Sequence, residues 1–114
     1  MIWMPRAYRM TVVDGVCTVR LVGEIDFANA DQVTDWLLNA IDGSKCARLE
    51  VDFAELAFLD SSGIRALLTV YRHATSRDVD VAFRNTQPGV QRTLRLAGVD
   101  SLLGTGAPAS QDSD

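Results

Sequence analysis

Apolar and polar residues alternate along three segments of this chain, with the period expected of β-strands. In the segment 16–21, for example, Cys17 and Val19 alternate with Thr18 and Arg20. A strand covered on both faces would instead read as a continuous apolar run. The alternation therefore predicts a sheet with one covered face and one largely solvated face. The three segments are 16–21, 47–52 and 79–84.

A fourth alternating run begins at Tyr8 and is separated from the segment 16–21 by Asp14 and Gly15. Aspartate and glycine both tolerate the positive φ angles that a two-residue hairpin turn requires. We therefore expect the chain to open with an antiparallel hairpin.

Between and after these segments, apolar residues recur every three or four positions, which is the spacing of one face of a helix. This spacing predicts helices over 29–41 and 61–76, and a third helix that begins at Pro88 and stops near Gly98. A short strand is expected at about 101–103. Strands joined through a helix lie parallel in right-handed crossovers. We therefore predict an α/β fold with a mixed β-sheet, opened by an antiparallel hairpin, that carries its helices on one face.

The length of 114 residues suits one domain. We assign this domain to residues 1–103 and expect 104–114, which is small and polar, to be a disordered C-terminal tail. No run approaches a membrane span of roughly 18 consecutive apolar residues. The first ten residues also lack the apolar segment of a secretory leader. A cytoplasmic location without membrane insertion is therefore expected.

The charge balance disfavours a nucleic-acid partner. The chain has 11 basic and 15 acidic residues and a net charge of -4, whereas a nucleic-acid binder should carry a basic field. Cys17, Cys46 and His73 are the only cysteines and the only histidine, and their spacing matches no zinc site. We therefore expect neither a metal nor a cofactor.

The segment 58–71, "FLDSSGIRALLTVY", contains two adjacent serines at the start of the second predicted helix. A catalytic nucleophile is the first interpretation, but neither serine satisfies the G-x-S-x-G pattern of a hydrolase elbow. The available base, His73, follows Ser62 by 11 residues on the same predicted helix, a separation of roughly 16 Å. A hydrogen bond needs about 3 Å. Ser–His catalysis is therefore excluded, and no enzymatic activity is expected.

Helix capping and phosphorylation are the two remaining interpretations. Asp and Ser are preferred directly before a helix, so Asp60 or Ser61 alone would serve as the cap. Capping requires neither Ser62 nor Gly63. A hydroxyl at a helix start is accessible to a kinase, a phosphate is well tolerated there, and Gly63 would let a partner approach closely. The residues by themselves leave both interpretations open.

Two segments carry a resemblance to a known family. "LVGEIDFANADQV" at 21–33 and "VDFAELAFLDSSGIRALL" at 51–68 resemble the STAS-domain anti-sigma factor antagonists of bacteria. The similarity runs from about Tyr8 to Leu103. It implies the STAS fold, and it implies that Ser61, the first serine of the pair, is phosphorylated by a cognate anti-sigma factor with serine kinase activity.

The resemblance further implies that Asp26 lies near Ser61 and forms a partner-binding surface with Asp60, Ser62 and Gly63. Read from the residues alone, Asp26 is equally well a turn or capping acid. In the family, the unphosphorylated chain binds the anti-sigma factor so that a sigma factor is released. A serine phosphatase would reset the switch.

Two alternatives assign the chain a different role. STAS domains also serve as non-switching partner subunits of membrane transport complexes. A phospho-relay receiver using Asp52 or Asp60 would need a parallel sheet covered on both faces, which the hairpin and the alternating strands disfavour.

The chain departs from the family in one respect, because 104–114 contains no apolar stripe for the helix that usually follows the last strand. The oligomeric state stays open between monomer and weak dimer.

Overall fold

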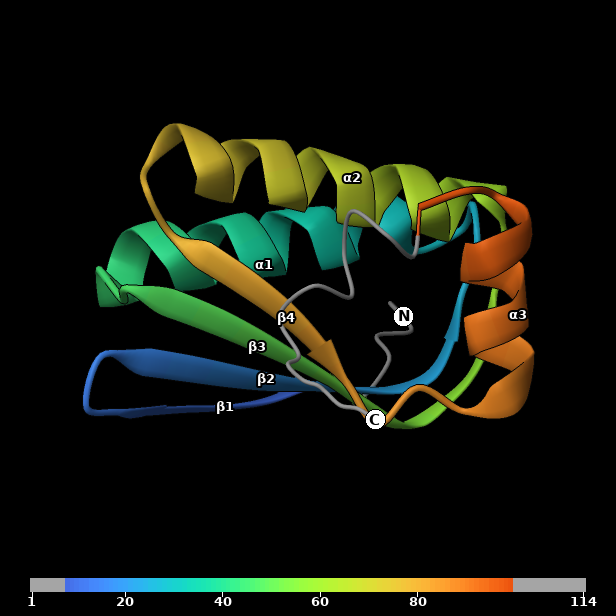
Figure 1. Ribbon diagram of the computed structural model, residues 1–114, viewed down its shortest axis with the longest axis horizontal. Coiled ribbons are helices and arrows are strands. Elements are labelled where there is room, and N and C mark those ends of the chain that lie inside the picture. The colour runs from blue at the N-terminus through green and yellow to red at the C-terminus, as the bar shows by residue number, and fades with distance from the viewer. Residues whose placement is uncertain (1–7, 100–114) are drawn as a thin grey trace.

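The computed structural model describes residues 8–99, which form a four-stranded mixed sheet and three helices (Figure 1). The strands lie in the order β1-β2-β3-β4, with β1 antiparallel to β2 and the other neighbours parallel. The predicted fold class is therefore confirmed. The strand expected at 101–103 and the tail expected at 104–114 lie outside the described residues. In chain order the elements are β1 (Tyr8–Val13), β2 (Val16–Ile25), α1 (Ala30–Ser44), β3 (Arg48–Leu59), α2 (Ser61–Ser76), β4 (Asp80–Arg84) and α3 (Pro88–Leu96).

The predicted hairpin joins β1 to β2 through Asp14 and Gly15, whose φ angles are 51° and 81°. Val13 and Val16 face each other across the last pair of the ladder. Two consecutive residues with positive φ are what a tight turn between twisted strands requires. The Asp-Gly signal therefore identified this turn correctly.

The helices α1 and α2 lie side by side on one face of the sheet, and α3 lies at the end of the sheet (Figure 1). The core forms between this helical layer and the inward-facing strand residues. Its strand members in β2, and in β3 as far as Phe53, follow the predicted alternation, whereas in β4 the adjacent Val81 and Ala82 are both buried. The members from α1 come from the predicted stripe. In α2 the predicted apolar stripe is only half-buried at Ile64, Leu68 and Tyr71, and the buried face instead runs through Ala66, Leu67, Val70 and Ala74. Fully or almost fully buried examples are Cys17, Val19, Leu21, Leu49 and Val51 from the sheet, and Val33, Leu37, Leu67 and Val70 from the helices.

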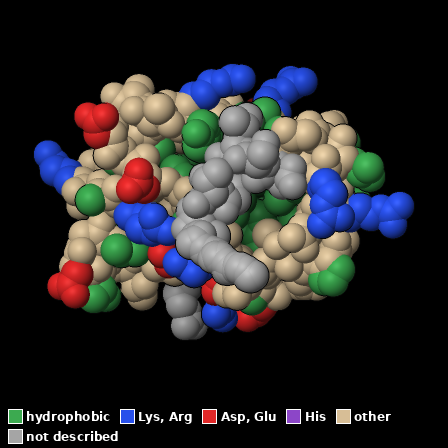
Figure 2. All heavy atoms as spheres, viewed as in Figure 1, with side chains coloured by type: hydrophobic (Ala, Val, Ile, Leu, Met, Phe, Trp, Pro, Cys, Tyr) green, Lys and Arg blue, Asp and Glu red, His purple; other side chains and the backbone are tan. Residues whose placement is uncertain are grey.

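Ion pairs cover the opposite face of the sheet. Arg20 contacts both Asp52 and Glu55 at 3.1 Å, and Arg84 contacts Glu50 at 3.1 Å. These side chains occupy the polar positions of the alternating strands, so the expectation of one solvated face is confirmed. On the face that Figure 2 shows, acidic and basic side chains also lie interspersed.

The strand β3 is longer than the sequence predicted, because it continues from 47–52 to Leu59. Its register with β2 shifts twice, and each shift places one extra β3 residue opposite β2. Such bulges break the strict alternation of a strand, so burial beyond Phe53 recurs at every third residue, at Leu56 and Leu59. At the second shift Gly23 has a φ of 94°. The extension carries the chain to the start of α2.

Candidate functional site

The ends of β2 and β3 bring two loops together at one end of the sheet. Ile25 pairs with Leu59, and the backbone N–H of Asp60 donates to the carbonyl oxygen of Ile25 at 3.2 Å. Because the two strands are parallel, Asp26 and Asp60 leave the sheet as neighbours. This is the arrangement expected where ligand and partner sites form at the carboxyl ends of parallel strands.

Asp60 caps α2. Its backbone is extended, and its Oδ1 accepts hydrogen bonds from the backbone N–H groups of Ser62 at 2.8 Å and Gly63 at 3.1 Å. These bonds satisfy two of the amides that a helix leaves unpaired at its start. The capping interpretation is therefore confirmed for Asp60. The same bonds also engage two of the N–H groups that could otherwise face an anion.

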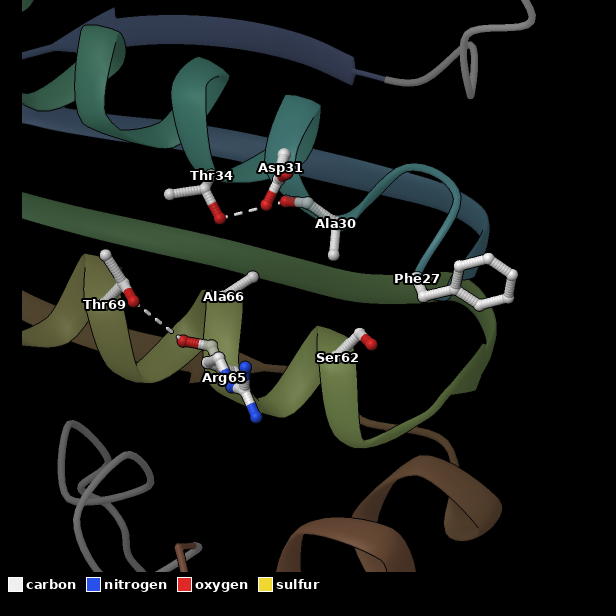
Figure 3. Close-up of a pocket in the computed structure, with 8 residues that line it drawn as sticks. All are labelled: Phe27, Ala30, Asp31, Thr34, Ser62, Arg65, Ala66 and Thr69. Atoms are coloured by element: carbon white, nitrogen blue, oxygen red, sulfur yellow. Dashed lines mark hydrogen bonds between the residues drawn. The ribbon is translucent and has the colours of Figure 1, made fainter.

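The two serines of the motif point into different surroundings. Ser61 is the first residue of α2 and is exposed, whereas Ser62 is half-buried and directed toward α1 (Figure 3). A hydroxyl must reach the active site of a kinase to be phosphorylated, and the exposed position of Ser61 meets that requirement. The geometry thus distinguishes the two serines, as their adjacency in the sequence could not.

Gly63 is buried at the point where α2 rests on the sheet. A Cβ atom at this position would overlap the Leu59 side chain and would lie 3.0 Å from Cγ2 of Ile25. The absence of a side chain therefore lets the first turn of α2 approach the strand ends. Packing inside the molecule explains the glycine, and its contact with a partner stays a prediction.

Asp26 belongs to a hydrogen-bonded turn between β2 and α1. Its Oδ1 accepts from the N–H of Ala28 at 2.9 Å, and its own N–H donates to Oδ1 of Asn29 at 3.0 Å. The side-chain amide of Asn29 donates in turn to the carbonyl oxygen of Glu24 at 2.8 Å. The turn-acid interpretation of Asp26 is therefore confirmed, and its contact with a partner stays a prediction.

Asn29 is a residue that the sequence analysis missed. It is 4% exposed and is the only polar side chain buried among the described residues. Its two hydrogen bonds fix the loop that carries Asp26 and Phe27. An asparagine directly before a helical stripe is a recognisable signal for a helix start. This signal could have identified Asn29 from the sequence.

Phe27 was also missed, although it is the most exposed large apolar side chain among the described residues, at 82%. It lies at the mouth of a groove of about 270 Å³ between the first halves of α1 and α2 (Figure 3). Small side chains such as Ala30 and Ala66 form part of this groove, and Ser62 and Arg65 contribute from α2. Phe58, the second-to-last residue of β3, is 47% exposed. The site therefore combines exposed aromatic surface with an accessible hydroxyl.

His73 takes no part in this site. Its Nε2 lies 2.9 Å from Oδ1 of Asp42 in α1, and this contact is the main cause that holds the pKa of Asp42 below its usual value. His73 lies in the last turn of α2, whereas Ser61 and Ser62 open the same helix. The separation that argued against Ser–His catalysis is therefore observed.

Within residues 8–99, no group of three or more His, Cys, Asp or Glu side chains is placed to hold a metal ion. None of the helices in this range has the length and apolar character needed to cross a membrane. Asp52, one of the two residues of the receiver alternative, lies on the open sheet face, where its carboxylate accepts hydrogen bonds from Arg20 and Asn85. Burial alone would raise the pKa of Asp52, but hydrogen bonds from Ala54, Asn85 and Arg20 hold it below its usual value.

Comparisons with a family model and with known proteins agree on one family for this chain. The family model described as STAS domain matches residues 7–112. The anti-sigma F factor antagonist of Paenibacillus polymyxa is 30% identical over 89 residues, which cover 78% of this chain and 76% of that protein. Sulfate transporter 1.3 of Arabidopsis thaliana is 28% identical over 104 residues, which cover 82% of this chain but only 16% of the transporter.

Solved structures share the fold. The anti-sigma factor antagonist SpoIIAA in its unphosphorylated form superposes with a TM-score of 0.73 at 23% identity, with 85% of each chain covered. The structure of SpoIIAA in its phosphorylated form, described as a Bacillus cell fate determinant, gives a TM-score of 0.66 at 22% identity, with 85% of this chain and 88% of that chain covered.

Proposed function

The chain belongs to the STAS domain family, and we propose that it acts as an anti-sigma factor antagonist switched by phosphorylation of Ser61. The position of Ser61 carries this proposal. Ser61 is exposed, follows the capping Asp60 directly, and opens α2 at the end of the sheet where Phe27 projects. The relatives named as anti-sigma factor antagonists support the choice of partner. The proposal includes a cytoplasmic location, where a sigma factor acts.

In this proposal the unphosphorylated chain docks on an anti-sigma factor, which then releases its sigma factor. We define the docking surface as Asp26, Phe27, Asp60, Ser61 and Ser62, all at one end of the sheet. Exposed aromatic side chains are the usual anchors of protein interfaces, because they bury a large area with few rotatable bonds. Phe27 is thus the expected apolar anchor beside the polar switch residue.

A phosphate on Ser61 would add about -1.5 to -2 charges to this surface. The Asp60 carboxylate lies directly beside it and already engages the N–H groups of Ser62 and Gly63. Docking would therefore have to desolvate two neighbouring anions, and taking a charged group out of water costs several kcal/mol per ion. Each 1.4 kcal/mol changes affinity about tenfold. One phosphate is sufficient to weaken docking strongly without any backbone movement.

The proposal assigns the kinase activity to the anti-sigma factor and the reset to a serine phosphatase. The test is to incubate the cognate anti-sigma factor and ATP with the unmodified chain and with the variants Ser61→Ala and Ser62→Ala. Mass spectrometry should find one phosphate on the unmodified chain and on Ser62→Ala, and none on Ser61→Ala. Loss of phosphorylation in Ser62→Ala alone would contradict the assignment.

The similarity to sulfate transporters favours one other candidate function. The chain would then be a non-switching partner subunit of a membrane transport complex and would dock through the same face. This candidate predicts that the chain is captured by a transporter ATPase rather than by an anti-sigma factor. It also predicts that a phosphate at Ser61 has no effect on that binding.

A further inference from the structure

The first turn of α2 has few free donors for a phosphate on Ser61. The N–H groups of Ser62 and Gly63 donate to the Asp60 carboxylate, and the N–H of Ile64 donates to the Asp60 carbonyl oxygen at 3.0 Å. The Asp60 carboxylate also adds a negative charge where the phosphate would lie. The helix start therefore offers little to offset the new charge, and a nearby cation would stabilise the phosphate.

Arg65 lies four residues after Ser61 on the same helix. Residues four apart are neighbours on a helix surface, with Cβ atoms about 5–6 Å apart. Arg65 is exposed, and within residues 8–99 it forms no ion pair with any acidic side chain, in contrast to Arg20 and Arg84. Its guanidinium group lies along the outer side of α2 in Figure 3 rather than across the groove toward α1. The guanidinium is therefore available to a new anion.

We propose that Arg65 is the counter-charge of a phosphate on Ser61, and that phosphorylation creates an ion pair along the first turn of α2. The guanidinium presents paired N–H donors that match two phosphate oxygens, which makes arginine the preferred partner of phosphate. An anion placed N-terminal to a cation at this spacing is also the more favourable order along a helix. The inference rests on the proposed function for the choice of Ser61.

Asp60 and Asp31 are two further acids in this region, and within residues 8–99 no ion pair joins either of them to Arg65. Asp60 uses its Oδ1 for the helix cap, and Asp31 lies on the opposite side of the groove, on α1. A phosphoserine carries more charge than either carboxylate and reaches further from the helix. It is therefore the strongest competitor for the guanidinium once it is formed.

Arg72 provides a matched control on the same helix. It is exposed, and no acidic side chain within residues 8–99 pairs with it. It follows Ser61 by 11 residues, which places it roughly 16 Å further along the helix. The variants Arg65→Gln and Arg72→Gln remove the same charge from the same element. Only the first should alter the environment of the phosphate.

The experiment installs phosphoserine at position 61 of the full chain during expression, so neither a kinase nor a partner is required. In ¹H–¹⁵N spectra, the Nε–H resonance of Arg65 should shift on phosphorylation, whereas that of Arg72 should not. Phosphorylation should also lower the melting temperature by roughly 2 °C more in Arg65→Gln than in the unmodified sequence or in Arg72→Gln.

An Arg65 resonance unchanged by phosphorylation would overturn the inference. An equal effect of phosphorylation on the melting temperatures of all three proteins would do the same. The spectra of the unsubstituted protein suffice for a decision if a variant fails to fold. Because no anti-sigma factor enters this measurement, its failure is distinguishable from failure of the proposed function, which is tested through partner binding.

Discussion

Gly63 lies directly on Leu59, with no room between them for a methyl group. This contact sets how closely α2 approaches the end of β3, and so where the helix start and Ser61 are held. Asp60 completes the arrangement from the other side by capping the same turn. The exposed Ser61 is thus held in place by the buried Gly63 and by the hydrogen-bonded Asp60.

Gly63→Ala should destabilise the protein. The added methyl group must displace Leu59 and Ile25, and overpacking of this kind costs about 1–3 kcal/mol. The free energy of unfolding from urea titration measures the effect. Gly43→Ala is the control, because Gly43 lies in α1 with no atom within 4 Å of an added Cβ. That change should be neutral or stabilising by up to about 1 kcal/mol, and equal effects at both positions would contradict the packing argument.

Asp60→Ala should lower the free energy of unfolding by about 1 kcal/mol, because it removes the cap of α2. Asp60→Asn keeps an oxygen acceptor for Ser62 and Gly63 and should recover most of that loss. The same urea titration compares the two variants. If both lose the same amount, the hydrogen bonds of the cap are not what stabilises this helix start.

The open face of the sheet should make stability fall in acid. Burial by itself would raise the pKa values of Asp52 and Glu50, but hydrogen bonds and arginines on the same face lower both overall. Groups with a lowered folded pKa stabilise the protein above their unfolded values, which are about 4. That contribution is lost as the pH falls through the folded pKa values.

Asp52→Asn tests this pH dependence. The variant should be less stable than the unmodified protein at pH 7, since it removes the ion pair with Arg20. The difference should narrow as the pH is lowered below about 4, because Asp52 then becomes protonated in the unmodified protein. Urea titrations across this range measure it, and a constant difference would contradict the proposed role of the charge.

Phe27→Ala should weaken docking to the cognate anti-sigma factor about tenfold or more without lowering stability. Phe27 is 82% exposed, so its removal leaves the core intact, whereas aromatic anchors often contribute over 1.4 kcal/mol to binding. Val13→Ala is the control, because Val13 is 63% exposed at the hairpin, at the opposite end of the sheet. Binding that responds equally to both substitutions would argue against the defined docking surface.

Local patterns were enough to predict much of the fold. The hairpin at Asp14 and Gly15, the one-faced strands and the bounds of α2 all follow from turn chemistry and periodicity. The extension of β3 to Leu59 was missed because its two bulges replace the period of two with a period of three. Apolar residues at every third position resemble a loop or one turn of a helix, and only the pairing with β2 shows that this segment is a strand.

The candidate site could be predicted only in part. The motif offered Asp60 as a cap, and the two hydrogen bonds that its carboxylate accepts confirm this. The choice of Ser61 over Ser62 came from the family resemblance and stays a prediction. The exposure of Phe27, the buried loop contacts of Asn29 and the contact of Gly63 with Leu59 depend on how distant segments meet. Those properties follow from tertiary packing. No pattern in the neighbouring sequence distinguishes these three residues from others of the same type.

The most direct test of the account is the dissociation constant between this chain and its cognate anti-sigma factor, measured by calorimetry with and without phosphoserine at position 61. The account predicts that the unmodified chain and Ser61→Ala bind alike, and that the phosphorylated chain binds at least about tenfold more weakly. Equal affinity of the phosphorylated and unmodified chains would contradict the central claim that Ser61 is the switch.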